Sequence, residues 1–280
     1  MKRKFKIGVM SDCLGLGPDG GVKKAAELGA DGVQVWTTGG KMSPEQMDAA
    51  ARARFKAFCA DLGLEISALC GDLGGGFHNP QTNPASIERS KRIIDLAADL
   101  GTNVVTTHIG VVPDNPRNET YKVMLKACRE LAGHAAGKGV VFAVETGPEK
   151  AVTLKRLLDE VGSPGLGVNL DPANLVMVAA DDPVAAVHAL DDYIVHTHAK
   201  DGIRLKASDA EKTCSGQTPP ELGPGFKEVP LGEGGVDWDA YLDALSEIAY
   251  CGYLTIEREC GADRVGDIAA AIAFLREKVK

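Results

Sequence analysis

Four short apolar runs of this chain each end on a side chain that can bind a metal ion. These four residues are Glu145, Asp171, His198 and Glu257. The strand ends of a parallel sheet meet at one rim, so residues far apart in the sequence would converge there. Three carboxylates and one imidazole suit a hard or borderline divalent cation. The pattern therefore predicts a site for one divalent ion, for which Mn, Mg, Co and Zn are all chemically acceptable.

Each of these residues also has a plain structural interpretation. A carboxylate at a strand end can cap the next helix or pair with a lysine, and an Asp before a Pro, as in Asp171-Pro172, often begins a turn. The metal interpretation is favoured by the pair Glu145 and Glu257, which a closed barrel would place across from each other. Two such carboxylates would repel unless a cation or a proton lay between them.

Further polar residues stand at strand ends. His196 and His198 share a strand face because side chains alternate, so both should point into the barrel, with Lys200 near its mouth. We assign the metal to His198 and expect His196 to be a hydrogen-bonded core residue. His108 either binds substrate, supports the metal ligands or is structural. Residues with a weaker signal end the first three strands and could line the same pocket: Asp12, Gln34, Trp36, Cys70 and Asp72.

The elements that would position these residues alternate along the chain. Strands are predicted at 6–10, 32–36, 65–70, 103–108, 140–145, 167–171, 193–198 and 253–257. Between them lie stretches with apolar residues at helical spacing, several of which close on a Gly followed by a short apolar run. Eight such repeats in about 250 residues predict a single (β/α)8 TIM barrel of the α/β class. An open, doubly wound sheet is the alternative.

No composition break marks a second domain, so residues 1–280 are predicted to form one domain. The connection 205–235 interrupts the alternation, because it is long and rich in Gly and Pro, as in Gly223-Pro224-Gly225. Long loops in compact domains are usually functional or disordered. We predict that this connection is an active-site lid, with a loop of no function as the alternative.

Composition excludes several classes of function. The net charge of -8 argues against nucleic-acid binding, which usually requires a basic surface. No stretch reaches the ~18 apolar residues of a membrane helix, and residues 5–8 are no apolar core of a signal peptide. The seven cysteines are scattered without a CxxC pair, as in reduced cytoplasmic proteins. We expect a cytoplasmic protein that acts on a small polar substrate, and a homo-oligomer is compatible with the sequence.

The four ordered ligands also resemble a known family. Together with Arg204, six residues after His198, and the Pro-Leu-Gly-Glu-Gly segment at 230–234, they resemble the xylose isomerase-like TIM-barrel superfamily. This superfamily contains sugar and sugar phosphate isomerases and epimerases, inosose dehydratases, hydroxypyruvate isomerases and the endonuclease IV branch. The resemblance implies that the four ligands hold one divalent ion, that Glu145 and Glu257 also act as acid and base, and that Arg204 binds substrate.

Two positions depart from the pattern of the ketose 3-epimerases. Asn174 stands where the resemblance implies a substrate-binding His, and Ala151 stands where it implies a Glu. These differences argue against a ketohexose 3-epimerase, and the missing His also argues against the metal cluster of the endonuclease IV branch. The candidates for holding substrate oxygens, or a carboxylate or phosphate of the substrate, are His108, Lys200 and Arg204, and Asn174 is a further substrate-binding candidate.

The ligand set predicts a sugar isomerase or epimerase that acts on a polyhydroxylated carbonyl compound. A metal that bridges a carbonyl and a neighbouring hydroxyl would stabilise the enediolate formed on proton abstraction. Epimerisation results if Glu145 and Glu257 act from opposite sides, and isomerisation results if one acid does both transfers. Loss of a β-hydroxyl would instead make the site an inosose-type dehydratase or lyase. An AP endonuclease-like metal hydrolase and a non-catalytic sugar-binding barrel are the remaining alternatives.

Overall fold

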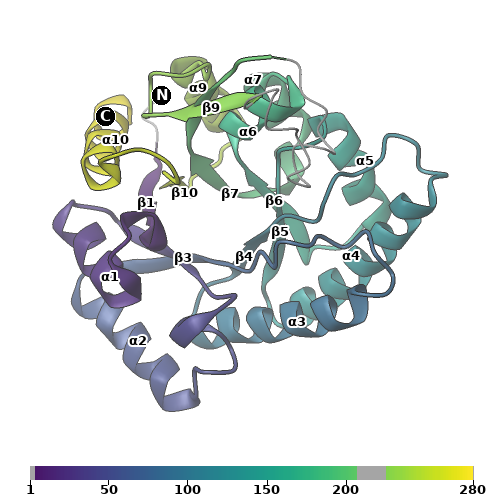
Figure 1. The fold of residues 1–280 in the computed structure, drawn as a ribbon, viewed down its shortest axis with the longest axis horizontal. Coiled ribbons are helices and arrows are strands. Elements are labelled where there is room, and N and C mark those ends of the chain that lie inside the picture. Colours follow the sequence, from purple (N-terminus) through teal and green to yellow (C-terminus); the bar gives the residue numbers. More distant parts are fainter. Residues whose placement is uncertain (1–3, 207–224, 280) are drawn as a thin grey trace.

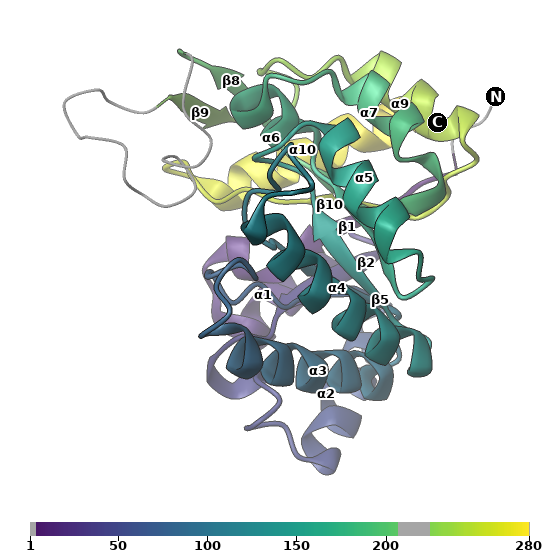
Figure 2. The same ribbon diagram turned by 90° about the vertical axis from the view of Figure 1, so that its right-hand side faces the viewer.

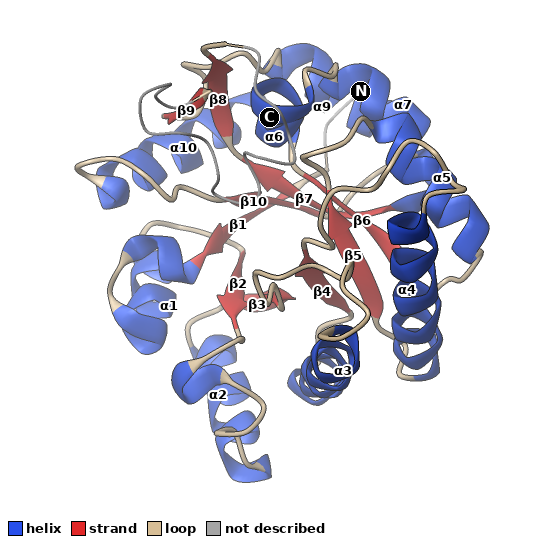
Figure 3. Cartoon of the chain, turned by 45° about the vertical axis from the view of Figure 1, so that its right-hand side comes forward, coloured by secondary structure: helices blue, strands red, loops and turns tan. Residues whose placement is uncertain are grey.

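The structure, a computed structural model, describes residues 4–206 and 225–279. At its centre lies a closed barrel of eight strands whose neighbours all pair in parallel (Figures 1 and 3). The barrel strands are β1 (Lys6–Met10), β2 (Gly32–Trp36), β3 (Glu65–Cys70), β4 (Val104–Thr107), β5 (Val141–Glu145), β6 (Leu166–Leu170), β7 (Ile194–Ala199) and β10 (Tyr253–Ile256). The predicted (β/α)8 barrel is confirmed, and the open sheet is excluded.

Helices cover the outside of the barrel, as the blue ribbons of Figure 3 show. They are α1 (Gly17–Glu27), α2 (Ala49–Asp61), α3 (Asn83–Leu100), α4 (Glu119–Gly137), α5 (Ala151–Val161), α6 (Pro172–Asn174), α7 (Pro183–Ala189), α9 (Trp238–Glu247) and α10 (Arg264–Lys278). Short 3-10 turns lie at Ser11–Leu14, Gly40–Met42 and Asp191–Tyr193, and a π-helix lies at Leu175–Ala179. Within the two described ranges, no helix is both long and apolar enough to cross a membrane.

Helix boundaries follow the sequence signals. The four glycines of the repeated helix-closing pattern, Gly29, Gly63, Gly101 and Gly139, have φ angles between 67° and 85°. This left-handed backbone is open to Gly at no steric cost, so each helix stops there and the chain turns into the next strand. Capping carboxylates mark several helix starts, such as Asp182, which accepts from the backbone N–H of Val184.

Strand bounds differ from the predicted ones by a single residue at several ends. β6 stops at Leu170 and β10 at Ile256, so Asp171 and Glu257 follow their strands instead of ending them. The carboxylate of Asp171 explains its own boundary, because Oδ1 accepts from the backbone N–H of Ala173 at 2.8 Å and of Asn174 at 3.0 Å. This capping turns the chain into α6 and leaves Asp171 at the barrel mouth.

Apolar side chains fill two regions of the barrel. The main hydrophobic core lies between the strands and the surrounding helices and includes Ile7, Leu69 and Phe142. A separate small cluster contains Ala68, Val104 and Ala143. Ala143 shares a strand face with Glu145 because side chains alternate along β5, so this cluster forms an apolar layer inside the barrel, below the polar residues of its mouth.

A two-stranded hairpin extends beyond β7 (Figure 2). Its strands β8 (Asp201–Arg204) and β9 (Phe226–Val229) are antiparallel, with Asp201 opposite Val229. The buried carboxylate of Asp201 accepts from the backbone N–H groups of Gly232 at 3.0 Å and Val236 at 3.3 Å, and from Nε1 of Trp238 at 3.0 Å. These bonds tie the segment after β9 to the start of β8.

The hairpin changes part of the predicted lid. Residues 226–229, which were expected to belong to a long irregular connection, form a strand. No sequence pattern predicts strand β9, because it has only four residues and lies between Gly- and Pro-rich segments. Residues 207–224 of the predicted lid lie outside the described residues, so the lid itself stays a prediction.

The close approach of Gly165 to helix α4 provides a test of barrel packing. A Cβ at Gly165 would lie 2.1 Å from the carbonyl oxygen of Ala132 and 2.5 Å from the backbone N of Ala136. Gly165→Ala should therefore lower the free energy of unfolding by about 2 kcal/mol, because the backbone of α4 must shift. A matched change at Gly133, which has open space around it in the same helix, should raise stability by about 0.5–1 kcal/mol. Urea unfolding of both variants checks this, and equal effects would contradict the packing.

Candidate functional site

A cavity of about 830 Å³ opens at the carboxyl ends of the barrel strands, beneath the β8–β9 hairpin. In barrels of this type the strand ends carry the active site. Three of the weakly indicated residues, Trp36, Cys70 and Asp72, line the cavity, whereas Asp12 and Gln34 do not. Asp12 instead accepts a hydrogen bond from the backbone N–H of Trp36 at 3.0 Å.

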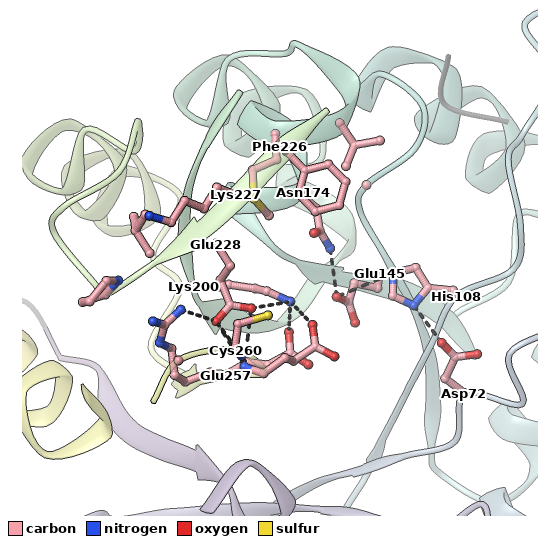
Figure 4. Close-up of a pocket in the computed structure, with 18 of the residues that line it drawn as sticks. Asp72, His108, Glu145, Asn174, Lys200, Phe226, Lys227, Glu228, Glu257 and Cys260 are labelled. Atoms are coloured by element: carbon pink, nitrogen blue, oxygen red, sulfur yellow. Dashed lines mark hydrogen bonds and ion pairs between the residues drawn. The ribbon is translucent and has the colours of Figure 1, made fainter. Parts of the chain in front are cut away.

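The four predicted metal ligands converge below this cavity. One potential ligand atom from each of Glu145, Asp171, His198 and Glu257 lies within 4.8 Å of the others, and all four residues are buried. Nδ1 of His198 is 3.2 Å from Oε2 of Glu257, 3.4 Å from Oε1 of Glu145 and 3.8 Å from Oδ2 of Asp171. Glu145 and Glu257 also line the cavity (Figure 4), so the cluster is open to a small molecule.

Two buried polar atoms of the cluster make no hydrogen bond, and both point to a cation. These atoms are Oδ2 of Asp171 and Nδ1 of His198. Nε2 of His198 lies 3.0 Å from Oε1 of Gln34, which can only accept, and 3.2 Å from Nδ2 of Asn169. When the neutral imidazole donates from Nε2 to Gln34, it presents a lone pair at Nδ1. A lone pair that faces three carboxylates needs a positive charge between them. The residues present therefore fit one divalent ion.

Protonation of His198 is the alternative way to satisfy the cluster. Burial alone would lower the pKa of His198, but the carboxylates of Glu257 and Glu145 raise it well above its usual range. A proton and a metal ion would thus compete for the same nitrogen, because a metal ligand must be deprotonated. Whichever is bound, the position between the carboxylates requires positive charge.

A second layer of hydrogen bonds orients the ligands. Gln34, which accepts from His198, is fixed by its own bond from Nε2 to Oγ1 of Thr106 at 2.7 Å. The side-chain oxygen Oδ1 of Asn169 lies 2.8 Å from Nδ1 of His196. The side-chain nitrogen Nδ2 of Asn169 donates a hydrogen bond to Oε2 of Glu145 at 3.2 Å. His196 is thus a buried, hydrogen-bonded residue below the ligands, and burial and His198 hold its pKa well below the usual range. Such partners commonly fix the orientation of metal ligands.

His108 lies at the side of the cavity, between two carboxylates. Its Nδ1 is 2.9 Å from Oδ2 of Asp72, and its Nε2 is 3.7 Å from Oε1 of Glu145. Burial opposes protonation, but the carboxylates of Glu145 and Asp72 raise the pKa of His108 to about 10. Asp72 thus orients the imidazole so that Nε2 faces the cavity as a hydrogen-bond donor (Figure 4).

Lys200 is the buried cation nearest to Glu257 (Figure 4). Its Nζ lies 2.9 Å from Oε2 of Glu257 and 2.6 Å from Oε2 of Glu259. Although burial favours the neutral acid, Lys200 and His198 hold the pKa of Glu257 well below its usual range. Glu257 is therefore a carboxylate at neutral pH, with one oxygen already bound by an ammonium group.

Asn174 and Arg204, two of the predicted substrate-binding residues, differ in whether they line the cavity. Asn174 lines the cavity, and its Nδ2 donates to Oε1 of Glu145 at 3.1 Å and to the carbonyl oxygen of Thr146 at 3.3 Å. Arg204 lies on β8 and does not line the cavity, and its Nε is 3.4 Å from the carbonyl oxygen of Lys206. The structure thus brings His108, Asn174 and Lys200 together and leaves Arg204 on the hairpin.

Several cavity residues are absent from the sequence prediction. Glu228 of β9 accepts from Nη1 of Arg258 at 2.6 Å, and its Oε2 lies 3.9 Å from Nζ of Lys200. Met177 and Val178 of the π-helix also line the cavity, and π-helices are frequent at functional sites. Arg258 could have been found from its place directly after Glu257, whereas nothing in the sequence marks Glu228.

Comparison with known proteins gives one family and several relatives. A profile described as xylose isomerase-like TIM barrel matches residues 22–278. The 2-epi-5-epi-valiolone 7-phosphate 2-epimerase of Actinoplanes sp. is 28% identical over 232 residues, which cover 79% of this chain and 76% of that protein. A xylose isomerase domain protein from Planctomyces limnophilus is 26% identical, with a TM-score of 0.80 over 99% of this chain and 98% of that chain. A probable 3-DHS dehydratase, AsbF from Bacillus anthracis, is 21% identical, with a TM-score of 0.74 over 97% and 99% of the two chains, and shows the same fold.

The unpaired cluster atoms give a prediction for metal binding. The protein should bind one Mn or Zn ion, and at 100 times the dissociation constant this binding should raise the free energy of unfolding by about 2.7 kcal/mol. Asp171→Asn keeps the capping oxygen but removes one charge, so metal affinity should fall at least roughly 100-fold. The metal-free variant should be no less stable than the parent, because one repelling carboxylate is lost. Metal content and unfolding with and without metal measure both effects.

Asp182→Asn is the matched control for this experiment. Asp182 also caps a helix, through its bond from the backbone N–H of Val184 at 2.9 Å, but it lies outside the cluster. This variant should keep the parent's metal affinity. Equal losses in Asp171→Asn and Asp182→Asn, or no bound metal in the parent, would contradict the assignment.

Glu149, a buried residue of the loop after β5, gives a prediction for pH. Its Oε2 accepts from the backbone N–H of Val112 at 3.2 Å, and burial raises its pKa to about 7. The folded state therefore binds this proton more tightly than the unfolded state, so the stabilising effect is complete below about pH 4.5 and is lost as the pH rises through about 7. Glu149→Gln should match the parent near pH 4.5 and exceed its stability by up to about 3 kcal/mol above pH 7. Urea unfolding at pH 4.5 and pH 8 measures this, and Glu119→Gln, at an exposed helix position, is the control.

Proposed function

Because the chain belongs to the xylose isomerase-like TIM barrel family, we propose that it is a metal-dependent sugar isomerase or epimerase that acts on a polyhydroxylated carbonyl compound. The buried cluster of Glu145, Asp171, His198 and Glu257 below an open cavity supports this proposal most directly. The similarity to a sugar-type epimerase, 28% identical over most of both chains, supports the same class of reaction.

The four cluster residues would hold one divalent ion, which when bound would polarise the carbonyl and the neighbouring hydroxyl of the substrate. Proton transfer at the carbon between these groups falls to Glu145 and Glu257, which reach both the cluster and the cavity. Lys200 keeps Glu257 ionised, which is the protonation state that a general base requires. Amide groups of Asn169 and Asn174 fix both oxygens of Glu145, at 3.2 Å and 3.1 Å. Fixed carboxylates of this kind suit general acid-base catalysis.

The remaining polar residues of the cavity would hold the substrate. Nε2 of His108 and the ammonium group of Lys200 are donors at two sides of the cavity, and Asn174 lies between the π-helix and Glu145. These groups would bind hydroxyl oxygens away from the reacting carbon. Arg204 would reach a substrate only if the hairpin moved, because it does not line the cavity.

A dehydratase is the second candidate function. The same two glutamates could remove a proton next to a carbonyl and then assist the departure of a β-hydroxyl group as water. The shared fold with a probable 3-DHS dehydratase makes this reaction relevant, although that likeness extends to the fold alone. The products separate the two reactions, because an epimer keeps the mass of the substrate and a dehydration product loses one water.

The proton-transfer role is tested by Glu145→Gln and Glu257→Gln. Each change keeps one ligand oxygen and a similar shape but removes the base, so turnover should fall about 10²- to 10⁴-fold while metal content falls much less. The measurement is metal content, together with deuterium uptake from solvent into a panel of keto-sugars and inososes. Mass spectrometry of the products separates epimerisation from dehydration.

Glu233→Gln serves as the control, because Glu233 also lines the cavity but lies outside the metal cluster. This variant should keep near-normal exchange. If Glu145→Gln and Glu257→Gln also keep near-normal exchange with metal bound, the two glutamates are not the proton carriers.

A further inference from the structure

The cavity is chemically divided into a polar floor and an apolar wall. The floor is formed by the barrel residues described above, whereas the wall comes from the hairpin and the π-helix. The apolar residues of this wall are Phe226, Met177, Val178, Val229 and Pro230. Met177 and Val229 are already buried, but a polyhydroxylated compound alone would leave the partly exposed Phe226, Val178 and Pro230 in contact with water, which is unfavourable for apolar surface.

Phe226 is placed to face a bound molecule. It shares a face of β9 with Glu228, because side chains alternate along a strand, and Glu228 reaches inward to Arg258 and Lys200. Phe226 therefore points to the same side, over the mouth of the cavity (Figure 4). Its ring is partly exposed, so apolar surface is available for a ligand.

The π-helix holds the other part of the wall close to the hairpin. A Cβ at Gly202 of β8 would lie 2.2 Å from Sδ of Met177, so this glycine lets the two elements approach each other. Met177 is thereby buried between β8 and the cavity. The wall is a packed surface and not a set of isolated side chains.

The charges of the cavity disfavour an anionic substrate group. Six carboxylates line it, against three lysine or arginine side chains and the imidazole of His108, which already contacts Asp72 and Glu145. Two of these cations are already paired, since Lys200 binds Glu257 and Glu259, and Arg258 binds Glu228. Lys227 is the one that has no ion pair among the described residues, and its exposed position on β9 leaves it in water. A single exposed ammonium is a weak anion site compared with a bidentate Arg or a free helix N-terminus.

Acidic side chains also lie where barrels of this type often hold a phosphate group. In TIM barrels, phosphate groups are often held by the loops after the last two strands and by the N-terminus of a nearby helix. Here those loops supply Glu228 and Glu259, and the N-terminus of α10 is capped by its own Asp263, which accepts from the backbone N–H of Gly266 at 2.9 Å.

From the apolar wall and the charges, we propose that the substrate is an uncharged sugar or cyclitol ketone that carries an apolar substituent, which packs against Phe226, Met177 and Val178. This inference rests on the proposed function, because the ketone is placed at the metal cluster. The cavity of about 830 Å³ lies in the upper part of the range of roughly 300–1,000 Å³ that holds drug-sized ligands, so both parts fit. The site would discriminate against a phosphate ester of the same ketone.

A matched set of compounds tests this proposal. An inosose, its mono-O-benzyl ether and its monophosphate are titrated by calorimetry into the Mn-loaded protein. The benzyl ether should bind roughly tenfold more tightly than the free inosose, because several apolar carbons leave water. The monophosphate should bind more weakly than the free inosose. A monophosphate that binds as tightly as the benzyl ether, or a benzyl ether no better than the free inosose, would overturn the proposal.

Variants locate the effect at the wall. Phe226→Ser should remove most of the advantage of the benzyl ether and leave binding of the free inosose unchanged, which also shows that the site is still folded. Phe226→Leu should keep part of the advantage. Val152→Ser, at a 60% exposed position outside the cavity, is the control and should change neither affinity.

A second measurement separates failure of the proposed substrate class from failure of the proposed reaction. Deuterium exchange is measured on a panel of ketones and inososes, each with and without an apolar substituent, in the same experiment. Exchange without any preference for the apolar compounds would overturn only the substrate class. Absence of metal-dependent exchange with every compound, with or without an apolar group, would overturn the proposed reaction itself.

Discussion

The structure depends on one electrostatic constraint, the confinement of three carboxylates and one imidazole in a buried space at the barrel mouth. Their ligand atoms lie within 4.8 Å of one another, a distance at which like charges cannot coexist without a compensating cation. The closed barrel imposes this proximity, because the four residues are carried by neighbouring elements of one sheet. Folding energy from the surrounding apolar core therefore maintains a site that is unfavourable until a positive charge occupies it. Lys200 and His108 relieve part of the repulsion from the cavity side.

Much of this arrangement was accessible from the sequence, because strand ends in a parallel barrel have predictable positions. The alternation of strands and helices predicted the barrel, and the four residues that converge in the buried cluster were singled out from their places after apolar runs. Contacts between side chains of different strands could not be predicted from the sequence. Asn169, for example, is one polar residue within β6 with no distinctive sequence pattern, yet its side-chain amide contacts both His196 and Glu145. Such a role depends on side-chain direction and on the register between β6 and β7, which shifts at Val168 and Asn169.

The β8–β9 hairpin and the π-helix could not be predicted from the sequence either. A four-residue strand after a long Gly- and Pro-rich connection has too few residues for a periodic pattern, so β9 was missed together with Glu228 and Phe226. The π-helix after Asn174 has the composition of an ordinary apolar helix, because its distinctive feature is hydrogen-bond spacing and not residue type. Both elements shape the cavity wall, whereas the predicted residues form its floor. Sequence patterns thus identified the residues of the cavity floor and missed those of its wall.

The buried carboxylate of Asp201 fixes the hairpin to the segment that follows it. It fixes the segment after β9 by accepting from Gly232 and Trp238, while antiparallel pairing holds β8 to β9. The two ends of the connection between positions 206 and 225 are therefore anchored independently of whatever chain joins them. Loop length has only a slow effect on the entropy of closure, so this connection can be exchanged or lengthened at small thermodynamic cost. The chain thus offers an engineering point at which new recognition segments can be grafted beside the cavity.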